Sequence, residues 1–83
     1  MEVWCVYALR SKRDGGFYVG MSSDVKERLE YHNQGYNRST RSRTPFELVY
    51  LEERVSRLEA RKREKYLKSG IGRKFLKERL AGR

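Results

Sequence analysis

The sequence predicts an α+β domain in which helices flank a three-stranded sheet. Residues 3–9, 17–19 and 46–51 have strand composition, because β-branched, aromatic and other apolar residues dominate all three runs. Two helix starts also stand out, since Asp24 and Ser56 each stand three residues before a glutamate, the spacing of a capping box. Strands followed by helices, with only short connections between them, favour one mixed domain.

The first two strands are expected to form a hairpin. Residues 3–9 carry apolar side chains on both alternating faces, which favours a central strand covered on both sides. Asp14-Gly15-Gly16 then supplies turn residues, because glycine adopts positive φ without a Cβ clash. The chain returns through Phe17-Tyr18-Val19, and Gly20 is expected to close this second strand.

A first helix is expected from Asp24 to Gln34, with Gly35 as its stop. The segment 35–45 is polar and basic and ends at Pro45, so it should form a loop before the third strand.

Ser56 opens a second helix that should reach Lys68, where Ser69-Gly70 ends it. The apolar spacing of Phe75, Leu76 and Leu80 predicts a short third helix over 73–80.

The charge of the chain indicates a polyanionic partner. Twenty Lys and Arg against eleven Asp and Glu give a formal charge of +9, the electrostatic footprint of a nucleic-acid-binding protein. No run approaches the about 20 apolar residues of a transmembrane helix, and no signal peptide is apparent, so we expect no membrane partner. A single cysteine and a single histidine exclude an internal disulfide and a Cys/His zinc site. We therefore expect a cytoplasmic protein with one domain over residues 1–83.

Glu64 is the most informative single position. It shares a helical stripe with Ala60 and Leu67, so its carboxylate should point with apolar side chains rather than toward water. A buried carboxylate is costly unless it is paired or holds a metal. Two interpretations follow: a salt bridge to a neighbouring Lys or Arg, or a ligand for a hard cation such as Mg²⁺, which keeps several waters.

Four other side chains have both a structural and a chemical interpretation. Arg28 and His32 border the apolar stripe of the first helix, where an arginine can be a surface residue or a phosphate clamp. His32 is either a helix-end hydrogen-bonding residue or a proton acceptor suited to neutral pH. Tyr7 and Tyr18 are ordinary strand residues by default, and either one would need nearby cations to act as a base.

Taken in order, these residues resemble the GIY-YIG nuclease family. Tyr7 in Cys5-Val6-Tyr7 stands eleven residues before Tyr18 in Tyr18-Val19-Gly20, Arg28 and His32 follow on one helix, and Glu64 lies on a later one. Each triplet alone is weak, whereas the ordered set is specific and covers about residues 3–68. The resemblance is strongest to the small stand-alone bacterial members, and it implies a three-stranded antiparallel sheet flanked by helices. It also implies divalent-metal-dependent hydrolysis of nucleic-acid phosphodiesters.

The resemblance also implies roles for individual residues. Glu64 would hold Mg²⁺ or Mn²⁺, and Arg28 would stabilise charge on the scissile phosphate. Tyr7 and Tyr18 would orient the attacking water or the phosphate, with Tyr7, Tyr18 or His32 as the base. Gly20 would let the backbone approach the substrate closely, and Asn33 would contact phosphate. Two residues depart from the family pattern: Cys5 stands where the name-giving glycine would be, and Met21 stands where the excision-repair incision nucleases carry a lysine.

The expected partner is nucleic acid, in the first place DNA. Its track would be made by basic residues of the first helix and the following loop, namely Lys26, Arg38, Arg41 and Arg43, with ordinary solvated surface as the alternative interpretation. Little sequence specificity is expected. Selectivity for a substrate structure, a role in DNA repair or recombination, and the oligomeric state stay open. The alternatives to a nuclease are a binding module of the same fold that does not cut, and a basic protein with an acidic protein partner.

Overall fold

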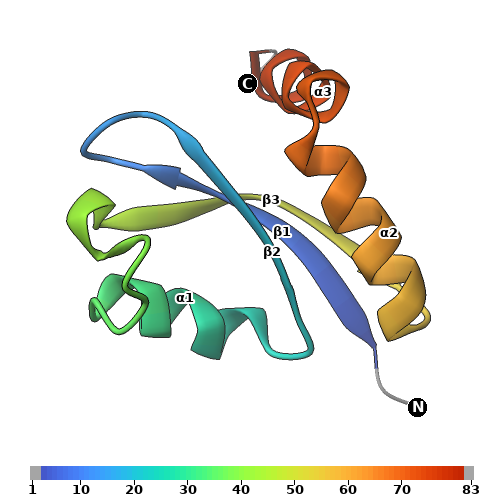
Figure 1. The fold of residues 1–83 in the computed structure, drawn as a ribbon, viewed down its shortest axis with the longest axis horizontal. Helices are drawn as coiled ribbons and strands as arrows, with labels where there is room; N and C mark the ends of the chain where they lie inside the picture. The colour runs from blue at the N-terminus through green and yellow to red at the C-terminus, as the bar shows by residue number, and fades with distance from the viewer. Residues whose placement is uncertain (1–2, 82–83) are drawn as a thin grey trace.

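The computed structural model describes residues 3–81, and its centre is a three-stranded antiparallel sheet in the order β2-β1-β3 (Figure 1). Strand β1 spans Trp4–Ser11, β2 spans Phe17–Ser22 and β3 spans Phe46–Arg54. Because β1 pairs with both neighbours, the expected central position of the first strand is confirmed. The predicted domain also includes residues 1–2 and 82–83, which lie outside the described range.

Two strands run further than the sequence indicates. The prediction that β2 closes at Gly20 is wrong, because Cys5 continues the pairing as far as Ser22. The third strand likewise runs past Leu51 to Arg54, which lies opposite Trp4. Both extensions follow from the length of β1, because a partner strand satisfies the backbone groups of residues whose own composition is weakly strand-like.

Helices cover both faces of the sheet. Helix α1 (Val25–Asn33) lies on one face, and α2 (Arg57–Lys68) and α3 (Gly70–Ala81) lie on the other (Figure 1). The expected loop contains one short 3₁₀ helix, η1 (Arg41–Arg43). No helix within residues 3–81 is long and apolar enough to cross a membrane.

The helix ends follow the capping signals in the sequence. The Asp24 side chain accepts a hydrogen bond from the Glu27 N–H at 3.0 Å, and Ser56 Oγ accepts one from the Glu59 N–H at 3.1 Å. Helix α3 begins three residues earlier than the expected residue 73, at Gly70. The reason is Ser69, whose Oγ accepts a hydrogen bond from the Gly72 N–H at 3.2 Å, so that one serine both follows α2 and caps α3.

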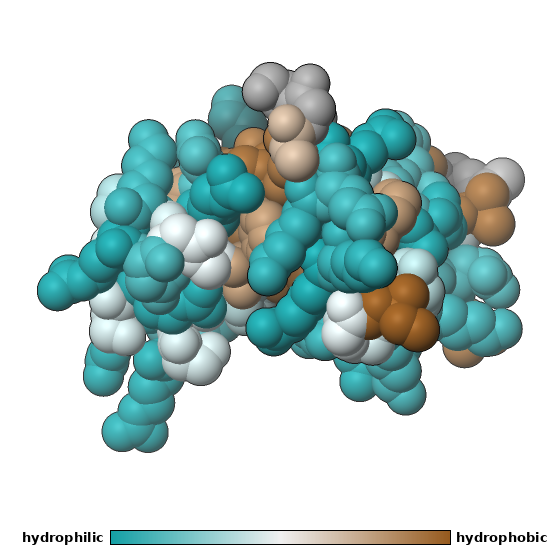
Figure 2. Space-filling view, turned by 90° about the horizontal axis from the view of Figure 1, so that it is seen from above, coloured by the Kyte–Doolittle hydropathy of each residue, from teal (hydrophilic) through white to brown (hydrophobic). Residues whose placement is uncertain are grey.

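The two faces of the sheet bury two separate cores. On the α2 and α3 side, the core consists of small and aliphatic residues: Val6, Ala8, Val19, Ala60, Leu67 and Leu76. On the α1 side, Tyr7, Leu9 and Phe46 are buried, with Val25 and Leu29 of α1 packed against them. Hydrophilic side chains cover most of the face of the molecule seen in Figure 2, as the high net charge requires.

The junction of α2 and α3 leaves no room for a side chain at Gly72. A Cβ placed there would lie 2.1 Å from the Tyr66 carbonyl oxygen and 2.5 Å from Leu67 Cα, both of which are backbone atoms. At Gly70, by contrast, a Cβ would meet nothing within 4 Å. The path of the chain from α2 into α3 therefore depends on the glycine at position 72.

We expect Gly72→Ala to lower the free energy of unfolding by about 2–3 kcal/mol, the upper part of the range for overpacking, because the clash is with backbone atoms. In a domain of this size that corresponds to a fall in Tm of about 10–20 °C. Thermal unfolding followed by circular dichroism measures the change. Gly70→Ala is the matched control and should unfold at or above the wild-type temperature, and equal losses in both variants would contradict the packing argument.

Candidate active site at the β2 edge

The candidate site lies at the edge strand β2, which α1 and α2 contact from opposite faces of the sheet. Gly20 on β2 is the partner of Tyr7 on β1. A Cβ at Gly20 would lie 2.5 Å from Tyr7 Oη and 3.3 Å from Tyr18 Cε2. The absence of a side chain at Gly20 thus lets the phenol of Tyr7 reach across β2 to the sheet edge.

Tyr7 is a buried, neutral phenol. Its side chain is only 2% exposed, and burial together with the neighbouring Tyr18 raises the pKa of Tyr7 to about 12. The guanidinium of Arg28 opposes this rise, and the carboxylate of Glu64 adds to it, which places both groups in electrostatic reach of the phenol. At neutral pH Tyr7 therefore carries its proton and acts as a hydrogen-bond donor.

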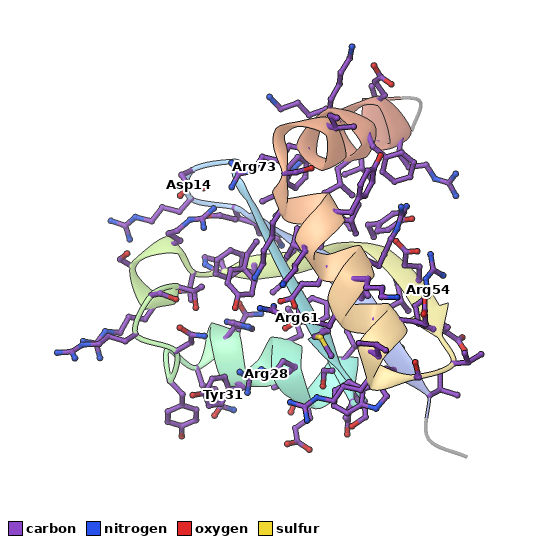
Figure 3. All side chains as sticks on the ribbon, turned by 45° about the vertical axis from the view of Figure 1, so that its right-hand side comes forward. Asp14, Arg28, Tyr31, Arg54, Arg61 and Arg73 are labelled. Atoms are coloured by element: carbon purple, nitrogen blue, oxygen red, sulfur yellow. The ribbon has the colours of Figure 1, made fainter. Side chains whose placement is uncertain are left out.

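Arg28 approaches the site from α1. Its guanidinium carbon lies 4.4 Å from the ring centroid of Tyr31, one helical turn further on, which is a cation–π distance. Stacking on a ring holds the flexible arginine in place while leaving its N–H groups free to bind an anion. Figure 3 labels Arg28 and Tyr31 together on this helix.

His32 lies behind Tyr18 rather than at the surface. Its ring is fully buried and its centroid is 4.7 Å from that of Tyr18. The Nδ1 atom is 2.9 Å from Thr40 Oγ1, whereas the buried Nε2 has no hydrogen-bond partner among the described residues. Burial, and secondarily the charge of Arg28, lowers the pKa of His32. In this conformation His32 supports Tyr18 and does not reach solvent.

Glu64 occupies the position that the helical periodicity predicts. It is 6% exposed and shares the buried side of α2 with Ala60 and Leu67. Its oxygens accept hydrogen bonds from Arg61 at 2.6 Å and Lys68 at 3.0 Å. Burial by itself would raise the pKa of Glu64, but these two cations outweigh burial and hold the pKa below its usual range. The salt-bridge interpretation of Glu64 is therefore confirmed, and the carboxylate is ionised at neutral pH.

The donor set is compatible with a hard cation that keeps most of its waters. Within residues 3–81 no three His, Cys, Asp or Glu side chains gather closely enough to form a protein metal cage. One ionised carboxylate beside solvent-filled space suits Mg²⁺, which proteins hold through one or two carboxylates together with substrate phosphates. A cation at Glu64 would compete there with the guanidinium of Arg61 and the ammonium of Lys68.

Two hollows lie near the site, and Glu64 lines one of them. The first hollow, of about 630 Å³, is lined by Trp4, Met21, Arg57, Leu58, Arg61 and Glu64. The second hollow, of about 210 Å³, is lined by Phe17, Tyr18, Val19, Arg43, Lys68 and Arg73. In Figure 3, Arg73 reaches from the start of α3 toward the hairpin turn that carries Asp14. Glu64 lines the first hollow, and Lys68, which bonds Glu64, lines the second.

The expected nucleic-acid track divides into exposed and anchored residues. Lys26, Arg38 and Arg41 are exposed and available to a ligand. Arg43 is partly committed, since it forms a 2.8 Å ion pair with Asp14 and a hydrogen bond to the Phe17 carbonyl.

Asn33 has a structural role that the sequence did not indicate. Its side-chain amide donates to the Phe46 carbonyl at 3.0 Å and accepts from the Phe46 N–H at 2.7 Å. These bonds join the end of α1 to the start of β3. They use the oxygen and one N–H of the exposed amide, and its second N–H is the donor that would contact phosphate.

Sequence reasoning also missed an ion-pair network on β3. Glu52 accepts hydrogen bonds from Arg63 on α2 at 2.8 Å and from Tyr50 Oη at 3.2 Å, and it pairs with Arg54. Arg54 lies two residues from Glu52 on the same strand, a spacing that puts both side chains on one face, but Arg63 is eleven residues away on α2 and no local spacing signals its contact. Arg61 and Lys68, in contrast, lie three and four residues from Glu64, a spacing that predicts contact on a helix.

Comparisons with known proteins agree on one family. A family model described as "GIY-YIG catalytic domain" matches residues 3–75. A "UPF0213 protein" of Staphylococcus aureus is 37% identical over 78 residues, which cover 93% of this chain and 94% of that protein. A "UPF0213 protein" of Streptococcus pneumoniae is 40% identical over 57 residues, covering 68% of this chain but only 58% of that protein.

One solved structure is also similar in fold and in sequence. It is the solution NMR structure of the UPF0213 protein BH0048 from Bacillus halodurans, with a TM-score of 0.55 and 35% identity. The match covers 89% of this chain and 81% of that one.

The buried histidine predicts a pH dependence of stability. Below the ordinary histidine pKa of 6.5 the unfolded chain binds a proton that the folded chain does not, so the free energy of unfolding falls as the pH falls. The slope can reach about 1.4 kcal/mol per pH unit. Asp14 and Glu64, whose pKa values are held low, lose their contributions only at more acidic pH. Urea unfolding at several pH values between 7.5 and 5 measures the slope.

His32→Gln provides the control, since a glutamine cannot titrate and the slope in this range should disappear. The chain has a single histidine, so an NMR titration reports on His32 alone. A histidine midpoint at or above the ordinary value would contradict the buried neutral ring.

Proposed function

Because the chain belongs to the GIY-YIG family, a family of nucleases, we propose that it is a divalent-metal-dependent endonuclease that hydrolyses phosphodiester bonds of DNA. The observation that carries this proposal is the convergence of Tyr7, Arg28 and Glu64 at the β2 edge. Tyr7 comes from β1, Arg28 from α1 and Glu64 from α2. Arg28 and Glu64 lie close enough to the Tyr7 phenol to influence its pKa, Arg28 lowering it and Glu64 raising it. Packing alone does not require a phenol, a guanidinium and a carboxylate to meet at one point.

Each residue has a role that its environment supports. Arg28, held by Tyr31, would donate hydrogen bonds to the scissile phosphate as negative charge develops on it. The neutral Tyr7 would donate its proton in a hydrogen bond to the same phosphate. Both groups are positioned before substrate binds, so they need no reorganisation during the reaction.

Glu64 is the residue that would hold the metal, in the form of Mg²⁺ or Mn²⁺. When bound, such a cation neutralises phosphate charge and lowers the pKa of a coordinated water. The protein contributes an ionised carboxylate with Arg61 and Lys68 beside it. Arg61 and Lys68 would themselves contact phosphates of the bound strand.

Of the three candidate bases, Tyr18 is the most exposed. Tyr7 is buried with a pKa of about 12, and His32 is fully buried. Tyr18 is half-buried and lines the second hollow together with Arg43 and Lys68, two cations that would attract the phosphates of a substrate. We therefore assign the proton-accepting role to Tyr18 and a positioning role to His32, whose ring packs against it.

A binding module without cleavage is the second candidate function. The ion pairs of Glu64 favour it, because a carboxylate already satisfied by two cations is a weaker metal ligand. The exposed Lys26, Arg38 and Arg41 serve a binding module as well as a nuclease. Both functions rely on phosphate contacts, which carry no sequence information, so little sequence specificity is expected from either.

Cleavage assays separate these functions. We expect wild-type protein to cut labelled DNA with Mg²⁺ or Mn²⁺ and not with EDTA, and Glu64→Gln to reduce the rate by about 10²–10³-fold while salt-dependent binding persists. Glu78→Gln, which removes an exposed carboxylate on α3, is the matched control and should cut normally. Binding without cutting by wild type, across duplex, flapped and single-stranded DNA and RNA, would establish the binding module instead.

Replacement of single phenols tests the assignment of the base. Tyr18→Phe should lower kcat by about 10²–10⁴-fold, the contribution of a positioned base, with little change in KM. Tyr36→Phe changes an exposed tyrosine on the loop after α1 and should leave both constants unchanged. A wild-type kcat for Tyr18→Phe would transfer the proton-accepting role to another group.

A further inference from the structure

The first hollow is larger than catalysis at Glu64 requires. Its volume of about 630 Å³ lies within the range of small-molecule sites, about 300–1,000 Å³. Glu64 forms only one part of its wall, and the rest comes from the start of β1, the end of β2 and the first turns of α2. None of those other residues except Arg61 has a role in the proposed reaction.

The floor of the first hollow is apolar and packs against the core. Trp4 and Met21 are partly buried and pack against the core of Val6 and its neighbours. Leu58, on the exposed side of α2, is 65% accessible and adds a third apolar side chain to the wall. An indole beside a thioether and a leucine forms a flat apolar surface that remains open to solvent.

The rim of the first hollow carries two arginines, Arg57 and Arg61, against the single carboxylate of Glu64. The guanidinium carbon of Arg57 lies 5.6 Å from the Trp4 ring centroid, within cation–π distance. Arg61, labelled in Figure 3, projects from α2 and bonds Glu64. A ligand that fits this hollow therefore has a flat apolar part for the floor and a negative charge for the rim.

We propose that the first hollow binds one unstacked nucleobase of the substrate strand, with the indole of Trp4 as its stacking partner. The inference rests on the proposed function in one respect, that the phosphate attached to this nucleotide is the one presented to Glu64. Aromatic stacking accepts every base, because each has a π-face, so the hollow would fix position without reading sequence. A second copy of the chain is a poor occupant, since both copies carry a formal charge of +9.

This occupant defines the class of substrate. A base inside a duplex is stacked and paired, so it can enter the hollow only after it is extruded, whereas a base in a single strand or a flap is free to enter. We therefore infer a preference for single-stranded or flapped nucleic acid over intact duplex.

Fluorescence of Trp4 tests the proposal directly, because the chain contains one tryptophan. The probes are a single-stranded octathymidylate and an abasic sugar-phosphate octamer of equal charge, each titrated in EDTA. We expect the base-bearing strand to quench the emission and to bind about tenfold more tightly than the abasic one. Equal quenching and equal affinity for the two probes would overturn the proposal in favour of purely electrostatic binding.

Two variants with the same charge change locate the bound base. Leu58→Glu places a carboxylate in the wall of the hollow and should weaken binding of the octathymidylate by about tenfold or more. Ile71→Glu changes a residue that is 71% exposed on α3 and lines neither hollow, and should weaken it by no more than about twofold. Both side chains are exposed, so both variants should fold, and equal losses would overturn the assignment of the site.

The outcomes also separate this inference from the proposed nuclease. Metal-dependent cutting with no base-dependent quenching would retain the nuclease and reject the base site. Base-dependent quenching with no cutting under any metal would retain the base site and reject the nuclease. A faster cleavage of flapped than of duplex DNA that Leu58→Glu removes and Ile71→Glu preserves is expected if both are correct.

Discussion

The pairing of β1 along both of its edges, together with burial of both of its faces, is the constraint on which the rest of the molecule depends. Alternate side chains of one strand supply both cores, with Val6 and Ala8 facing α2 and α3, and Tyr7 and Leu9 facing α1. A shift of one residue in the register would exchange these faces and move Tyr7 away from Gly20. The site therefore inherits its geometry from the strand that folding requires most.

The site also buries polar and charged side chains in a domain with a small core, which is unfavourable for stability. A domain of this length buries only about 60% of the surface that its unfolded chain exposes, so each buried polar side chain matters. Glu64 is compensated by two cations, but His32 leaves Nε2 without a partner among the described residues. The pairing of Arg63 with Glu52 joins α2, the helix that carries Glu64, to β3.

Local signals in the sequence predict the parts of the fold that depend on neighbours along the chain. The turn after Ser11, the caps at Asp24 and Ser56, and the buried side of α2 follow from spacing alone, and the structure has each of them. The membership of the GIY-YIG family was likewise readable from five ordered residues.

The features that sequence could not predict depend on partners from distant elements. The ends of β2 and β3 were misplaced because β1 sets their length. Buried His32 is hydrogen-bonded to Thr40, which the loop after α1 brings back against the helix. The side chain of Asn33 is hydrogen-bonded to the backbone of Phe46. Trp4, Met21 and α2 together form the first hollow, and no local pattern in the sequence relates them.

The paired bonds between Asn33 and Phe46 have an evolutionary consequence, because they join the chain where it leaves α1 to the chain where it re-enters the sheet. Extra residues inserted between Asn33 and Phe46 would lengthen a loop whose ends these bonds already hold together. The entropic cost of closing that loop grows only slowly with its length. The exposed tip around Arg38 is thus a position at which a lineage can acquire a new recognition element without disturbing the sheet below it.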